Sequence, residues 1–169
     1  MRLIVSDSSC LIDLRKASLL EAFLDLPYEV LIPDALFEEE LVRFTPAQKD
    51  LLLQGGLKVV EVPAESVLRA RAIVGDYPQL SIHDAFAFAL ADSCEDRMLL
   101  TGDSGLRALA ESYRLEVHGT LWVIDQIHNA GLAPTKVLLA VLRDFTDDPN
   151  VRLPRRELAA RIRRYKKAE

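Results

Sequence analysis

Short apolar runs alternate with amphipathic segments along most of the chain, and this alternation limits the fold more than any other feature. The runs are rich in Val, Ile and Leu, as in strands buried on both faces of a sheet. They occupy residues 2–6, 28–32, 57–62, 97–101 and 115–119. Strands that alternate with helices predict an α/β sandwich. We therefore expect a three-layer α/β/α sandwich with a central parallel sheet of about five strands.

The segments between and after these runs carry the spacing and end signals of helices. Pro33 and Pro63 suit the first turn of a helix, and Gly131 suits a helix C-cap. The predicted helices are 11–26, 34–45, 46–55, 65–75, 81–94, 104–113, 120–131 and 134–145. The helix within 81–94 contains AFAFALA, is apolar on most of its faces and is expected to be buried.

The length of 169 residues, half of them apolar, fits one domain with a well-formed core. No stretch approaches the roughly 18 apolar residues needed to span a bilayer. The opening residues 1–10 turn polar too soon for a signal peptide, so we expect a cytoplasmic protein with no membrane contact. The two cysteines, Cys10 and Cys94, are too few for a disulfide scaffold and are expected to be reduced.

Charge is distributed unevenly along the chain. Residues 151–169 contain eight Arg or Lys against Glu157 and Glu169, a net charge of +6. Since the whole chain carries −5, the remainder carries −11. A basic tail on an acidic body could bind phosphates or an acidic partner, and a solvated helix end explains it equally well. The overall acidity argues against a high-affinity, non-specific nucleic-acid binder.

Carboxylates stand where strands give way to helices. Asp7 follows the first strand directly, Asp103 follows the fourth, Asp84 begins the apolar helix and Glu39 lies in the helix after Pro33. Ligands in parallel sheets bind beyond the carboxyl ends of the strands, where the strand order reverses. Carboxylates gathered there would repel one another unless a cation neutralised them. Mg²⁺ and Mn²⁺ prefer such oxygen ligands, so the pattern favours a metal site.

Each acid also has a purely structural explanation. Asp7 and Asp103 could be helix N-caps. Ser81 and Asp84 fit a capping box, and Glu39 could belong to a solvated helix face. These explanations remain open for any one residue. A cap is served equally well by Ser, Thr or Asn, however, and the repeated choice of Asp favours a shared role.

The motifs that carry these acids resemble those of PIN-domain ribonucleases, of the kind found in VapC-type toxins. The resemblance spans residues 2 to roughly 130. It rests on VSDSSCLI (5–12), IPDALFEE (32–39), IHDA (82–85), LLTGD (99–103) and VHGT (117–120). It implies a PIN-like nuclease domain over residues 1–130, followed by a helical extension with a basic tail, residues 131–169, packed on the same domain.

The resemblance also implies an activity. Asp7, Glu39, Asp84 and Asp103 would be the metal ligands and catalytic residues of an endoribonuclease that uses Mg²⁺ or Mn²⁺ to hydrolyse single-stranded RNA. Counting from Pro33 favours Glu39, with Glu40 as the alternative. Relatives often carry a further acid where this chain has Gly105. A toxin would bind an antitoxin, and the C-terminal helices could contact it or a second copy of the chain in a homodimer.

Other classes fit the residues less well. Gly102-Asp103-Ser104-Gly105 matches a serine-protease motif, but that fold is rich in antiparallel strands. A haloacid-dehalogenase-like phosphatase needs Asp where Ser9 stands. The chain has no Walker or dinucleotide-binding glycine loop. The remaining rival is a PIN fold without catalysis that serves as a protein-binding or scaffold module.

Overall fold

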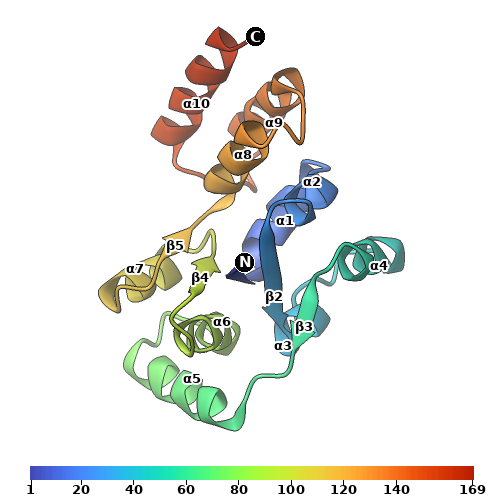
Figure 1. Ribbon diagram of the computed structural model, residues 1–169. Coiled ribbons are helices and arrows are strands. Elements are labelled where there is room, and N and C mark those ends of the chain that lie inside the picture. The colour runs from blue at the N-terminus through green and yellow to red at the C-terminus, as the bar shows by residue number, and fades with distance from the viewer.

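A five-stranded parallel sheet forms the centre of the molecule in the computed structural model, which describes residues 1–169 (Figure 1). Its strand order is β3-β2-β1-β4-β5. The strands are β1 (Arg2–Ser6), β2 (Tyr28–Pro33), β3 (Lys58–Val60), β4 (Arg97–Leu100) and β5 (Val117–His118). The predicted α/β sandwich with about five parallel strands is therefore confirmed. The strand order reverses between β1 and β4, which is where such folds bind ligands.

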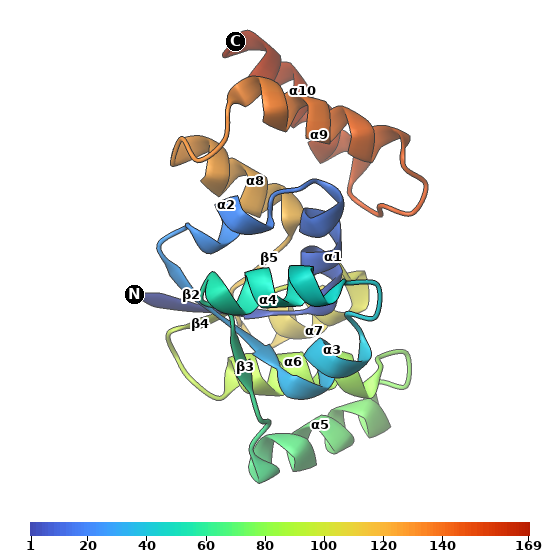
Figure 2. The same cartoon turned by 90° about the vertical axis from the view of Figure 1, so that its right-hand side faces the viewer.

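Ten helices surround the sheet. They are α1 (Ser8–Lys16), α2 (Leu20–Leu24), α3 (Asp34–Glu39), α4 (Pro46–Gln54), α5 (Ala64–Asp76), α6 (Ile82–Asp92), α7 (Ser104–Ser112), α8 (Thr120–Asn129), α9 (Thr135–Asp147) and α10 (Arg155–Lys167). Helices α1, α2 and α8 lie on one side of the sheet, and α5 and α6 lie on the other (Figures 1 and 2). No helix is both long enough and apolar enough to cross a bilayer.

The core forms on both faces of the central strand. Ile4 and Val5 of β1 are fully buried, as expected for a strand flanked by two others and covered by helices on both sides. The apolar helix α6 packs against β1, β2 and β4. Its Ala85, Ala87 and Phe88 are fully buried, because the small alanine side chains let the helix lie close to the sheet. This packing places the first turn of α6 beside the end of β1.

Two predicted helices are shorter than expected. The segment predicted as one helix over 11–26 divides into α1 and α2 at Ser18, whose φ is +55°. The amide of Leu19 donates to the carbonyl of Leu14 and the amide of Ser18 to that of Arg15, which is a Schellman motif. The helix predicted over 34–45 ends at Glu39 instead. Thr45 adopts an extended conformation, because Pro46 disfavours the helical one in the residue before it.

The C-terminal helices form a layer outside α8. Helix α9 packs on α8, and α10 packs on α9 (Figure 1). Asp125 of α8 fastens α10: it accepts hydrogen bonds from Arg161, Arg164 and the hydroxyl of Tyr165. Burial, followed by the neighbouring Asp125 carboxylate, raises the pKa of Tyr165. The extension 131–169 therefore contacts α8, which in turn packs against α1 and α2.

Candidate functional site

Asp7 lies at the carboxyl end of β1, at the point where the strand order reverses. Its amide donates to the carbonyl of Leu100 at 2.8 Å and so continues the pairing of β1 with β4. Its side chain is only 3% exposed. Oδ1 accepts from the amide of Ser8 at 2.9 Å, so Asp7 is the N-cap of α1, and Oδ2 accepts from two hydroxyls. A helix cap alone would not require a carboxylate buried to this degree.

The pKa of Asp7 is raised from 3.8 to about 6. Burial is the largest cause, because it penalises the charged form, and the nearby charges of Asp84 and Glu40 add to it. Hydrogen bonds from Thr101 and Ser9 oppose the shift by stabilising the carboxylate. The structure therefore brings three carboxyl groups close enough to affect one another: those of the residues after β1 and after α3, and that of Asp84 in α6.

Two hydroxyls join the ends of β1 and β4 around Asp7. The Thr101 hydroxyl donates to Oδ2 of Asp7 at 2.8 Å and accepts from the amide of Asp103 at 3.0 Å. The Ser9 hydroxyl donates to the same oxygen at 3.0 Å and accepts from the amide of Gly102 at 2.9 Å. Thr101 is fully buried. These bonds hold the Asp7 carboxylate in one orientation.

Asp84 forms the capping box that its sequence predicted. Its amide donates to the Ser81 hydroxyl, and its Oδ2 accepts from the Ser81 amide, each at 3.0 Å. The other oxygen, Oδ1, has no hydrogen-bond partner. The half-buried Asp84 side chain thus serves as a helix cap and also places negative charge near Asp7. The structural and functional interpretations of Asp84 are compatible.

Glu40 is the glutamate whose charge acts on Asp7. Glu40, the residue after α3, accepts a 2.9 Å hydrogen bond from the hydroxyl of Ser8 through Oε1. The side chain of Glu39 is 63% exposed and lies 2.6 Å from Nε2 of His83. The preference for Glu39 assumed a helix that continues beyond this point. Since α3 ends at Glu39, it is the following residue, Glu40, that bonds to Ser8 beside Asp7.

Asp103 is the N-cap of α7 and is joined to Asp7 through the Thr101 hydroxyl. Its Oδ1 accepts from the amide of Leu106 at 2.7 Å, and its Oδ2 has no hydrogen-bond partner. A Cβ added at Gly105 would lie 3.3 Å from both Oδ1 of Asp103 and Cδ2 of Leu80. The acid that relatives often carry at this position would therefore crowd Asp103.

The oxygens around Asp7 are of the type that a hard divalent cation binds, although the side chains are not arranged as a complete coordination shell. No three His, Cys, Asp or Glu side chains are grouped so as to hold a metal ion. The donors near Asp7 are carboxylate oxygens, which Mg²⁺ and Mn²⁺ prefer. Asp84 and Asp103 each retain an oxygen that caps nothing. Asp7 is held by three hydrogen bonds, and a carboxylate has about four acceptor sites.

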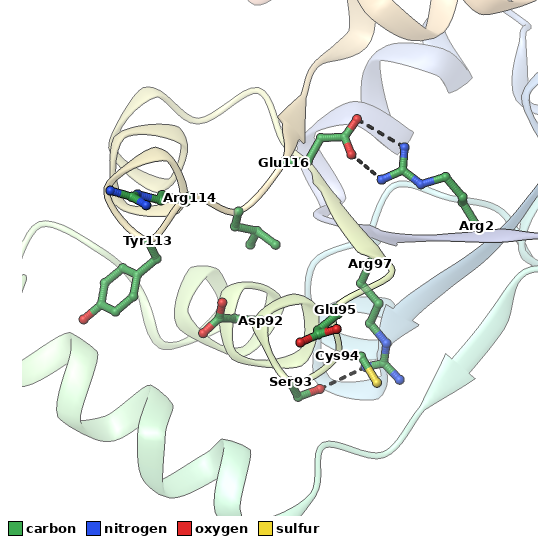
Figure 3. A pocket seen from close by; sticks show the side chains of 10 residues that line it. Arg2, Asp92, Ser93, Cys94, Glu95, Arg97, Tyr113, Arg114 and Glu116 are labelled. Atoms are coloured by element: carbon green, nitrogen blue, oxygen red, sulfur yellow. Dashed lines mark hydrogen bonds and ion pairs between the residues drawn. The ribbon is translucent and has the colours of Figure 1, made fainter.

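A pocket of about 470 Å³ lies at the opposite, amino ends of the strands (Figure 3). Arg2 begins β1 and is paired with Glu116, whose pKa is lowered to about 2 by hydrogen bonds from Arg2 and then His118. Arg97 begins β4 and donates to the Ser93 hydroxyl at 3.1 Å. Arg2 and Glu116 are the one ion pair among the residues that line this pocket, and ligands of parallel sheets bind at the other edge. This pocket is not the candidate site.

Asp7, Asp84 and Asp103 stay predictions as metal ligands, and the sequence did not point to Thr101, whose hydroxyl bonds to Asp7 and to the amide of Asp103. Its only signal was its position: a residue with a hydroxyl at the end of a strand, two places before a candidate acid.

Comparison with known proteins gives one family. A family model described as a PIN domain (DUF3368) matches residues 3–167. No curated protein matches the chain.

Proposed function

Because the chain belongs to the PIN domain family, we propose that it is an endoribonuclease that hydrolyses phosphodiester bonds of single-stranded RNA and requires Mg²⁺ or Mn²⁺. The observation that carries this proposal is the buried Asp7, whose pKa is raised to about 6 with Asp84 and Glu40 beside it. Perturbed carboxylates of this kind concentrate at active sites. A scaffold protein would have no use for like charges held together at the edge of its sheet.

In this proposal Asp7, Asp84, Asp103 and a glutamate of the 38–40 segment hold the cation. Glu40 fits this role better than Glu39, because only Glu40 is bonded to the helix turn that Asp7 caps. The cation, when bound, polarises the scissile phosphate and lowers the pKa of water. Thr101 and Ser9 keep the Asp7 carboxylate oriented and ionised by donating to it.

The reaction is a hydrolysis in which water is the only co-reactant. An oxygen of water attacks phosphorus in line with the bond to the 3′ oxygen, and that bond breaks. The leaving 3′ oxygen takes up a proton. The products carry a 5′-phosphate and a 3′-hydroxyl, as the family resemblance implies.

The experiment is a cleavage assay on a labelled single-stranded RNA with Mn²⁺ or with EDTA. We expect metal-dependent cleavage by the wild type. Asp7→Asn and Asp103→Asn should each lose at least about a hundredfold in rate, the scale seen when one charge-stabilising group is removed. Asp50→Asn is the matched control, since Asp50 is an exposed acid on α4. Equal trace activity in all four proteins would indicate a contaminant and favour the scaffold alternative.

We extend the proposal to a biological role: the chain is the toxin of a toxin–antitoxin pair. The support is its resemblance to VapC-type toxins. Expression of the wild type in a bacterial host should then arrest growth, and expression of Asp7→Asn should not. Arrest by both proteins, or by neither at matched protein levels, would contradict the toxin role. Sedimentation of the purified protein tests the homodimer.

A further inference from the structure

A cleft of about 740 Å³ opens beside the candidate metal site around Asp7, Asp84 and Asp103, which is called the acid site below. Its lining residues come from α7, from the start of α8 and from the first turns of α10 with the segment before them. Thr101 and Gly102 line one end of it. The same two residues bond to Asp7 and Ser9, so the cleft begins one residue away from the candidate catalytic carboxylate. An RNA strand bound at the acid site could continue into this cleft.

Two arginines in the cleft have no carboxylate partner. Arg107 comes from α7 and lies across Gly119, where an added Cβ would be 3.0 Å from its Nη2. Arg152 comes from the segment that leads into α10. Arg161 also lines the cleft, but two of its nitrogens, Nε and Nη2, donate hydrogen bonds to the carboxylate of Asp125. The acids Glu111 and Glu157 face the same space and form no ion pair with either free arginine.

An aromatic platform lines the same cleft. The imidazole of His118 is stacked on the indole of Trp122, with 4.2 Å between ring centroids and 12° between ring planes. Both side chains are half-buried. Bases of single strands stack on such side chains whatever their sequence, and arginines bind the backbone beside them. A duplex offers no free base face to the platform.

We propose that this cleft is the track along which single-stranded RNA leaves the acid site. Arg107 and Arg152 bind its phosphates, and the His118–Trp122 pair stacks a base. This inference rests on the proposed ribonuclease function and adds to it a location for the bound strand. It also gives the C-terminal extension a role, because Arg152 and the first turns of α10 form one wall.

The test measures RNA binding separately from cleavage. A fluorescein-labelled 12-nucleotide oligoadenylate is titrated with protein in EDTA, and Kd is read from fluorescence anisotropy at several salt concentrations. We expect Arg107→Ala with Arg152→Ala to raise Kd at least about tenfold. The salt slope should fall by about 1.4, since each phosphate contact on a single strand contributes about 0.7. Arg71→Ala, an exposed arginine on α5, should bind within about twofold of the wild type.

The aromatic platform has its own matched pair of variants. His118→Leu removes the stacking face and the bond to Glu116, and we expect Kd to rise at least about fivefold. His118→Phe loses the same bond but keeps a flat aromatic face, so it should bind within about twofold of the wild type. If His118→Leu unfolds, the Phe variant and the arginine variants decide the question.

Failure of the track and failure of the ribonuclease proposal give different results. The track is wrong if the double arginine variant binds RNA as the wild type does, if Arg71→Ala loses as much affinity, or if the wild type binds no RNA. The ribonuclease proposal is wrong if the wild type cuts no RNA with Mn²⁺. If both proposals hold, the double variant cuts with a raised KM and an unchanged kcat.

Discussion

The hydroxyl of Thr101 donates to Oδ2 of Asp7 at 2.8 Å, which joins the end of β4 to the end of β1. The same hydroxyl accepts from the amide of Asp103. One side chain therefore sets the position of two candidate metal ligands.

Replacing Thr101 with Val removes this hydroxyl and keeps the shape of the side chain. Thr101→Val should lower the free energy of unfolding by about 1–3 kcal/mol, because a buried carboxylate and an amide each lose a partner. The pKa of Asp7 should rise further, so cleavage at neutral pH should fall as well. Urea unfolding and the cleavage assay measure the two effects. Thr101→Ser keeps the hydroxyl and should restore most of both.

The raised pKa of Asp7 predicts how the stability of the metal-free protein changes with pH. The folded protein holds a proton on Asp7 below about pH 6, whereas the unfolded chain holds it only below about 3.8. The folded state therefore binds more protons in this window, and this group favours folding more as pH falls from 6 to 4. Above pH 6 the burial of ionised Asp7 lowers the free energy of unfolding by about 3 kcal/mol.

Asp7→Asn removes this cost. In EDTA at pH 7.5 the variant should be more stable than the wild type by up to about 3 kcal/mol, and the difference should shrink toward pH 4. Urea unfolding at both pH values measures it. A variant that is less stable than the wild type at pH 7.5 would mean that the hydrogen bonds to the carboxylate outweigh the cost of its burial.

Bound Mn²⁺ should stabilise the folded protein by mass action, by about 2.7 kcal/mol when free Mn²⁺ is a hundred times its Kd. Asp84→Asn should reduce this gain, because Asp84 places charge near Asp7. The glutamates form a matched pair: Glu40→Gln should reduce the gain, and Glu39→Gln should leave it unchanged. Melting temperatures with and without Mn²⁺ measure all three. A smaller gain for Glu39→Gln alone would return the assignment to Glu39.

Asp125 should stabilise the whole molecule, because we propose that residues 131–169 pack on the same domain as residues 1–130. Asp125→Ala leaves Arg161 and Tyr165 without their acceptor and should cost about 1–3 kcal/mol. The loss should shift one cooperative transition seen alike by circular dichroism and tryptophan fluorescence. Asp147→Asn, on the exposed surface of α9, should change nothing. An early, separate transition in the Asp125 variant would indicate an independent C-terminal unit.

The strands were predictable because each is a short apolar run with a clear boundary, and their common direction followed from the helices between them. Turns marked by glycine were predictable too: Gly56 and Gly131 both have positive φ after a helix. Ser18 and Arg114 take the same conformation without that signal. The break between α1 and α2 could therefore not be predicted from residue types.

The positions of the candidate aspartates could be predicted from the sequence, whereas the choice among the glutamates could not. Asp7 follows β1 directly and Asp103 comes three residues after the end of β4, so their positions depend mainly on the strand ends. The glutamate depends on where α3 stops, and three consecutive glutamates hide that point. Thr101 was missed because a β-branched residue at a strand end looks like part of the strand. Its role appears only when β1 and β4 are seen side by side.

A metal site around Asp7 is tested best by a crystal of the protein soaked in Mn²⁺, with the ion located by its anomalous scattering. We expect a peak at the carboxyl ends of β1 and β4, with an oxygen of Asp7 and an oxygen of at least one of Asp84, Asp103 and Glu40 about 2.1 Å from it. A saturating soak with no peak there, or with Mn²⁺ bound only elsewhere on the surface, would show that these carboxylates do not form a metal site.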